Sequence, residues 1–323
     1  MKIVFRASRE HLARSLAYMD GLRESEPSAE IALITSGSPK LGIEGVSQTD
    51  IGSQSTQSWD LEFTEEALGD GADILLLDNR PDEKAQKALK KKARMLVIVD
   101  DEPSCARYHA DVIVNPNIHA HTIDYPAPKE TETLLGTEFY PLPGPFDAFQ
   151  DFQRETGERC RKIAIHPGGD ESGLAAKALR ALKASKMHFL ATILLPENFA
   201  HGDNIAREIG LDERFIVADR DPRRLMDADL GIASPETIHE LIFFRIPSCL
   251  YGAQGAPLLS DYASRSGLSL PLPDAGSSLS LIEGLMENAE ERKRMSARMT
   301  DLVDGLGRFR LAEDILRIHT QKF

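Results

Sequence analysis

The sequence predicts an α/β protein built from two Rossmann-like domains whose parallel sheets face a cleft. Two observations support this fold class: short apolar runs alternate with segments of helical periodicity, and a proline-rich stretch interrupts the alternation near mid-chain. The chain has 323 residues, of which 41% are hydrophobic. That length is enough for two domains of about 150 residues each.

The first half of the chain carries apolar runs typical of parallel strands, which are buried on both faces and so lack polar alternation. These runs are KIVF (2–5), EIALIT (30–35), ADILLLD (72–78), RMLVIVD (94–100) and ADVIVN (110–115). Helical spacing of apolar residues predicts helices over 10–25 and 83–93. Residues 36–58, rich in Gly, Ser, Thr and Gln, are expected to form a loop with at most one weak strand.

Residues 115–160 break the rhythm with many prolines and are interpreted as a connector. The alternation then restarts with RKIAIH (161–166), HFLATILL (188–195), RFIVA (214–218), ADLGIAS (228–234) and PSCLYG (247–252). We therefore expect an N-terminal Rossmann-like domain over 1–155 and a C-terminal one over 156–323. As in similar two-domain folds, a final helix from about residue 308 is expected to cross back onto the N-terminal domain.

The composition narrows the possible partners. The formal net charge is -13, and such a surface repels nucleic acid and disfavours anionic membranes. The three cysteines are far apart and match no zinc spacing, so we interpret them as reduced thiols of a cytoplasmic protein. The N-terminus does not resemble a signal peptide, and no stretch approaches the ~20 apolar residues of a membrane span. The oligomeric state stays open.

The stretch IHPGGDESG, residues 165–173, places a diglycine turn between a strand end and a helix start. Such a turn can hold phosphate through bare backbone N–H groups and the helix N-terminus. The alternative is a tight turn in which Gly168 and Gly169 only relieve steric strain. Asp170 would repel phosphate, so we expect it to cap the helix and shape the turn.

Several segments in order resemble one family. They are MKIVFRAS, ADILLLDNR, RMLVIVDDEP, HADVIVNPN, IHPGGDESG and LVDGLGRFRLAEDIL. The chain resembles the nucleotide-sugar hydrolases of pseudaminic acid biosynthesis, which release UDP from UDP-2,4-diacetamido-2,4,6-trideoxy-β-L-altropyranose. It also resembles the spore-coat polysaccharide proteins and, more distantly, the MurG-type glycosyltransferases. The resemblance covers nearly the whole chain and implies a GT-B-like fold, with the sugar or acceptor on the N-terminal domain and the nucleotide on the C-terminal one.

The resemblance assigns roles in the nucleotide half. It implies that Gly168, Gly169 and Asp170 form the phosphate turn, and that Glu240, one turn inside the helix after residue 234, accepts hydrogen bonds from the ribose hydroxyls. The family has an asparagine before this glutamate, whereas this chain has His239, which we assign to substrate binding.

The reacting half departs further from the family. The family's glycine-rich loop before a catalytic histidine is shorter here and lacks glycines, although the histidine is kept as His11. His11 is either a general base or a surface histidine in the first helical turn. Arg6 is the best candidate for a diphosphate clamp, while Arg14 is expected on a solvated helix face. Arg80 stands near the family's tyrosine position and either binds substrate or pairs with Asp78.

Two further sets of polar residues are given structural roles. Asp100 and Asp101 end a strand at the carboxyl edge of the sheet, where paired acids could orient a histidine or bind a metal. Helix capping is the commoner use of such acids and is expected for Asp101. His119 and His121 stand at alternate positions without an obvious third metal ligand, so we interpret them as plain loop.

The resemblance implies a UDP-sugar hydrolase that acts on a nucleotide-activated amino sugar in cell-surface polysaccharide or nonulosonic acid biosynthesis. The partner would be a small-molecule nucleotide sugar, with no cofactor, no metal and no nucleic acid. One alternative is a GT-B glycosyltransferase that uses the same nucleotide half. The other is a non-catalytic nucleotide-sugar-binding homologue.

Overall fold

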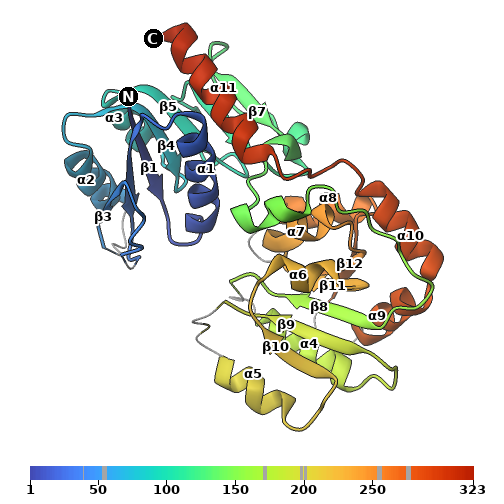
Figure 1. Cartoon of the computed structure of the whole chain (residues 1–323). Coiled ribbons are helices and arrows are strands. Elements are labelled where there is room, and N and C mark those ends of the chain that lie inside the picture. The colour runs from blue at the N-terminus through green and yellow to red at the C-terminus, as the bar shows by residue number, and fades with distance from the viewer. Residues whose placement is uncertain are drawn as a thin grey trace. The chain divides into compact units, whose positions relative to one another are not determined.

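The computed structural model of the chain is drawn in Figure 1. It describes residues 1–38, 40–52, 57–169, 173–196, 199, 202–252, 257–273 and 278–323, with only the backbone of 57–59. The chain divides into two compact units, the first formed by 1–144 with 305–323 and the second by 145–304. The sequence-based boundary after residue 155 thus lies inside the second unit, and the closing helix belongs to the first.

The first unit contains a seven-stranded sheet in which all neighbouring strands are parallel, in the order β3-β2-β1-β4-β5-β6-β7. The strands are β1 (Lys2–Ala7), β2 (Glu30–Thr35), β3 (Val46–Asp50), β4 (Ala72–Asp78), β5 (Ala93–Val99), β6 (Val112–Asn115) and β7 (Glu132–Leu135). Its helices are α1 (Leu12–Ser25), α2 (Gln57–Leu68), α3 (Glu83–Leu89) and α11 (Gly307–Lys322), with short 3₁₀ turns at Ala120–Thr122 and Thr137–Phe139.

Alternate residues of each strand point to opposite faces, so two separate cores cover this sheet. Ile3 and Phe5 of β1 pack with Tyr18 of α1 and Leu311 of α11 on one face. Val4, on the other face, packs in a second core that includes Leu68 of α2 and Leu89 of α3. Helices α1 and α11 approach closely, because a Cβ placed on Gly21 would lie 2.4 Å from the carbonyl oxygen of Arg308.

The second unit contains a six-stranded parallel sheet in the order β10-β9-β8-β11-β12-β13. The strands are β8 (Lys162–His166), β9 (Leu190–Leu194), β10 (Phe215–Ala218), β11 (Leu230–Ala233), β12 (Ser248–Tyr251) and β13 (Ser269–Leu272). Its helices are α4 (Leu174–Lys183), α5 (Gly202–Ile209), α6 (Pro222–Met226), α7 (Ile238–Phe243), α8 (Pro257–Arg265), α9 (Ser278–Glu287) and α10 (Ala289–Arg298), with 3₁₀ turns at Gly144–Phe149 and Pro235–Thr237.

The proline-rich connector is tightly bound to the second unit from residue 145 onward. The guanidinium of Arg154 donates to three backbone carbonyls, at 2.5 Å to Phe244, 2.8 Å to Ala228 and 2.8 Å to Met226. The buried guanidinium of Arg292 likewise donates to the carbonyls of Gly157 and Glu158, at 2.9 and 3.0 Å. These bonds make residues 145–160 part of a folded unit.

Four elements differ from the sequence expectation. Helix α2 and strands β7 and β13 are not predicted by periodicity. Both strands lie at the edges of their sheets, where short, partly polar segments are usual and a proline such as Pro271 is tolerated. Helix α3 ends at Leu89 rather than at residue 93, because β5 already begins at Ala93.

Candidate functional site

Each sheet has one place where the chain reverses its direction of progress across the sheet. In the first unit this switch point lies between β1 and β4, and in the second it lies between β8 and β11. The connections after the two strands leave in opposite directions there, which opens a crevice at their carboxyl ends where ligands of doubly wound folds gather. The segments that follow these four strands hold most of the sequence-predicted residues.

His11 and Asp78 meet at the first switch point. The ring Nδ1 of His11 lies 3.3 Å from Oδ1 of Asp78 and 3.2 Å from the backbone oxygen of the same residue. A carbonyl oxygen only accepts, so Nδ1 carries the hydrogen and Nε2 holds the lone pair of the neutral ring. The His11 side chain is 17% exposed, whereas that of Asp78 is fully buried. A carboxylate thus orients an imidazole whose other nitrogen can accept a proton.

Arg14 connects Asp78 to a second carboxylate. Its Nη2 and Nε donate to the two oxygens of Asp78 at 2.5 and 3.1 Å, and its Nη1 donates to Oδ1 of Asp101 at 2.7 Å. The expectation that Arg14 lies on a solvated helix face is therefore wrong. Ser15 adds a hydrogen bond to Asp78 at 3.0 Å. The buried carboxylate is held by both α1 side chains.

Asp101 does not cap a helix, contrary to the sequence expectation, since residues 101–110 form bends and irregular structure. It accepts hydrogen bonds from Arg14 at 2.7 Å and from Nδ2 of Asn117 at 2.6 Å. Burial opposes its charge, but the guanidinium of Arg14 and these hydrogen bonds outweigh burial and lower the pKa of Asp101 to about 2. The sequence analysis missed Asn117, although its place just after a strand end was a usable signal.

The two predicted arginines of this unit differ. Arg6 is fully buried, and its guanidinium donates to Oδ1 of Asp60 at 2.7 Å and to the carbonyl of Ala7 at 2.6 Å. Its donors are thus used inside the unit. Arg80 is exposed, makes no hydrogen bond or ion pair with the described residues, and has φ 50°. A left-handed arginine is strained, and such strain gathers at functional positions.

The diglycine turn of the second unit packs against the segment after β11. Gly168 has φ 62°, and a Cβ there would lie 2.6 Å from Oε2 of Glu236 and 2.7 Å from Oγ of Ser234. Only glycine fits this position. Gly169 instead faces open space, and its N–H donates to Oε2 of Glu236 at 3.4 Å. An acid thus occupies the anion-binding side of the turn. Asp170 lies outside the described residues.

Glu240 is paired with a histidine that the sequence analysis did not single out. Nε2 of His166, the last residue of β8, donates to Oε2 of Glu240 at 2.8 Å. The His166 side chain is fully buried, and that of Glu240 is 21% exposed. Burial opposes the negative charge, but His166 and Arg220 outweigh it and lower the pKa of Glu240. His239 on α7 is almost completely buried, at 1% exposure, and its role in substrate binding stays a prediction.

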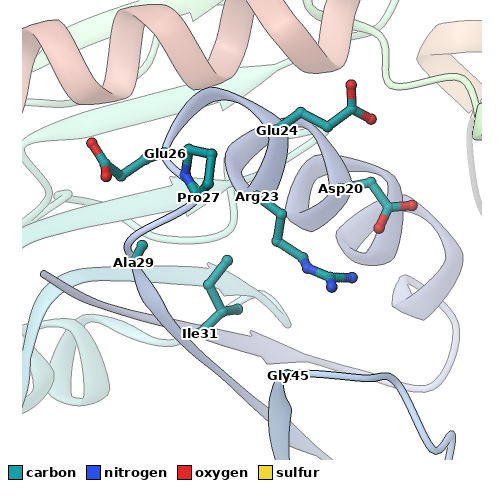
Figure 2. A pocket seen from close by; sticks show the side chains of 8 residues that line it. All are labelled: Asp20, Arg23, Glu24, Glu26, Pro27, Ala29, Ile31 and Gly45. Carbon is teal, nitrogen blue, oxygen red and sulfur yellow. The ribbon is translucent and has the colours of Figure 1, made fainter.

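Three further features of the described residues concern a hollow, metal ligands and membrane spans. A hollow of about 420 Å³, drawn in Figure 2, is lined by residues of the carboxyl end of α1 and the start of β2, such as Glu24 and Ile31, at the opposite end of the strands from His11. Within the described ranges, no three His, Cys, Asp or Glu side chains gather as metal ligands. No helix in that part of the chain combines the length and apolarity needed to span a membrane.

Comparison with solved structures identifies the fold. MurG from Acinetobacter baumannii has a TM-score of 0.65 at 11% identity, over 98% of this chain and 100% of that one. The UDP co-structure of S. aureus MnaA has a TM-score of 0.64 at 13% identity, over 100% and 97%. CalG4, the calicheamicin glycosyltransferase, has a TM-score of 0.65 at 13% identity, over 99% and 98%.

At these identities the likeness establishes the fold, and it confirms the predicted GT-B-like α/β class with two Rossmann-like domains. No protein-family model matches the sequence, and no curated protein does.

Proposed function

We propose that this protein is a UDP-sugar-dependent glycosyltransferase in which His11 is the general base and the second unit binds the nucleotide. The observation that carries the proposal is the His11–Asp78 pair at the first switch point, with Nδ1 held 3.3 Å from a fully buried carboxylate. A general base needs an oriented imidazole with a free nitrogen, and the carboxylate stabilises the charge that forms when Nε2 takes a proton.

The nucleotide half would act through its backbone and one carboxylate. The N–H of Gly169, the start of α4 and the guanidinium of Arg220, which donates to the carbonyl of Gly168, supply positive potential for a diphosphate. Glu240 would accept the ribose hydroxyls, held in place by His166. The co-structure of S. aureus MnaA with UDP supports a nucleotide in a protein of this fold.

In the proposed reaction, His11 removes a proton from an acceptor hydroxyl, which attacks the anomeric carbon while UDP leaves. The structural neighbour CalG4 is a glycosyltransferase, which supports this class. Hydrolysis is the second candidate, with water as the acceptor and the same base. It is favoured by the resemblance of segments such as IHPGGDESG to the nucleotide-sugar hydrolases. The guanidinium of Arg6 is bonded to Asp60 and to the carbonyl of Ala7 inside the first unit, whereas Arg80 would be available for an anionic group of the acceptor or sugar.

The test is to incubate the protein with UDP-sugars and to measure UDP release with and without candidate acceptor alcohols. Acceptor-dependent release supports the transferase, and equal release without acceptor supports the hydrolase. Binding of UDP by calorimetry without any turnover supports a non-catalytic homologue. Absence of UDP binding would refute the nucleotide assignment altogether.

Two variants separate the halves in the same assays. Glu240→Ala should weaken UDP binding by about 1–3 kcal/mol, the range for hydrogen bonds to charged groups. His11→Asn should leave UDP affinity nearly unchanged, since the proposal gives it no contact with the nucleotide. A thermal melt of each variant establishes that the comparison is between folded proteins.

A further inference from the structure

His166, the histidine that contacts Glu240, is buried and forms a polar contact with this candidate nucleotide-binding residue. His166 ends β8, Glu240 lies on α7 after β11, and these two strands are neighbours in the sheet. Their side chains are joined by one hydrogen bond, from Nε2 of His166 to Oε2 of Glu240, 2.8 Å long. The ring is fully buried, so its position is set by packing rather than by solvent.

The bond runs in one direction. An ionised carboxylate only accepts, so Nε2 donates. The ring's other nitrogen, Nδ1, is buried and has no hydrogen-bond partner among the described residues. The contact with Glu240 is thus the only polar contact of the ring in that part of the chain. Burying a polar ring costs free energy unless the ring forms a hydrogen bond. The bond to Glu240 offsets part of that cost, and it also fixes the orientation of the carboxylate.

The strand ends that carry this pair are also locked together. Oγ1 of Thr237 donates to the carbonyl oxygen of His166 at 2.9 Å, and the N–H of Ser234 donates to the same oxygen at 3.2 Å. The backbone of His166 is therefore fixed relative to the start of α7. A rigid ring on a fixed backbone holds one oxygen of Glu240, while the 21% exposure of that side chain leaves it accessible to a ligand.

We propose that His166 is a positioning residue that orients Glu240 for ribose recognition and so makes the site selective for ribonucleotides over 2′-deoxyribonucleotides. This rests on the proposed function, in which Glu240 accepts the ribose hydroxyls. A glutamate free to change rotamer loses part of its binding energy when it is ordered. A glutamate already held by His166 does not, and it presents its carboxylate in the one orientation that meets both hydroxyls of a ribose.

The experiment compares the Kd of UDP and dUDP by calorimetry for the full chain and three variants. Wild type should bind UDP about tenfold or more tightly than dUDP, because loss of the 2′-hydroxyl removes a hydrogen bond to a charged group. His166→Phe keeps a planar aromatic ring, slightly larger than imidazole, but has no donor. It should weaken UDP binding by about three- to tenfold and bring the UDP/dUDP ratio close to one.

Two controls separate positioning from general loosening. His166→Gln restores an amide donor near the place of Nε2, so it should recover most of the preference for UDP. Thr237→Val removes a hydrogen bond between the same strand ends without touching the carboxylate. It should weaken UDP and dUDP by the same factor and leave their ratio at the wild-type value.

The outcomes are distinct. A His166→Phe variant that binds both nucleotides with the wild-type ratio overturns the positioning role and leaves the nucleotide site standing. A wild type that binds neither nucleotide overturns both proposals. If His166→Phe does not fold, His166→Leu, which also lacks a donor, takes its place. A fall of the UDP/dUDP ratio in His166→Leu but not in Thr237→Val supports the inference. A wild-type ratio in His166→Leu, or an equal fall in both variants, refutes it.

Discussion

The two units of this protein use the same edge of the same kind of sheet in different ways. In the first unit, charged side chains at the switch point pair with one another. Arg14 bridges Asp78 and Asp101, and the ring of His11 contacts Asp78. In the second unit, the corresponding edge presents a glycine turn: the Cβ position of Gly169 meets open space, and its N–H donates to the carboxylate of Glu236. The first edge fixes a side chain in place, and under the proposed function the second edge would receive an anion.

The difference teaches how one topology can serve two tasks. A proton-transfer group needs a fixed orientation, and interlocked charges provide it at the cost of burying them. Anion binding needs undecorated backbone, which only small residues allow. The second unit also has one oriented pair, His166 with Glu240, close to its glycine turn.

The largest effect is expected from removing the oriented imidazole of His11, which tests the proposed role of the first unit. His11→Asn should lower turnover of the UDP-sugar substrate by about 100-fold or more, because it deletes the proton acceptor while the buried charges around it stay paired. Steady-state kinetics measure this, and UDP calorimetry serves as the control. Full activity in a folded His11→Asn protein would remove this residue from the reaction.

A second test addresses the interlocked charges through acid stability. The pKa of Asp101 is lowered from its ordinary value of 3.8 to about 2, so its ionised form stabilises the fold above the unfolded-state pKa. That contribution, about 2 kcal/mol at about 1.4 kcal/mol per pKa unit, is lost as the pH falls from about 4 to about 2. Urea unfolding across this range should show a smaller loss for Asp101→Asn than for wild type. Parallel curves for the two proteins would contradict the predicted charge network.

The glycine turn is tested by adding a side chain at Gly169. Gly169→Val should retain the fold, because a Cβ there meets nothing within 4 Å, yet weaken UDP binding by about tenfold through its bulk in the path of the phosphates. Uridine, which has no phosphate, should bind equally to both proteins. Gly168→Ala is the opposite case, since its side chain would strike Glu236 and should lower the melting temperature. Unchanged UDP affinity in folded Gly169→Val would place the phosphates elsewhere.

The smallest expected effect concerns the acid at this turn. Glu236 is exposed, and its carboxylate accepts from the N–H of Gly169 at 3.4 Å. It must move before a phosphate can use that N–H, so Glu236→Gln should tighten UDP binding by about fivefold, the equivalent of the ~1 kcal/mol repulsion between exposed charges. Its effect on uridine should be nil. Weaker UDP binding in this variant would mean that Glu236 helps the nucleotide rather than competing with it.

Much of the fold was predictable from local patterns. Apolar runs predict the central strands because a strand covered on both faces must be apolar throughout, as ADILLLD of β4 illustrates. The edge strands β7 and β13 were not predicted by this pattern, because part of each strand is exposed and carries polar residues or proline. The glycine turn was also predictable from the sequence, because two glycines follow the end of an apolar run. The φ of 62° at Gly168 is the local conformation that favours glycine there.

The pairs that make the candidate site were decided by tertiary structure. His11 stands after β1 and Asp78 ends β4, and nothing in their local sequence says that these strands are neighbours. The same holds for His166 and Glu240, which meet only because β8 lies beside β11. Local periodicity predicts a strand and where it ends, because those depend on near neighbours in the chain. Strand order depends on how the whole sheet buries its faces, so only the folded structure reveals which strand ends share a site.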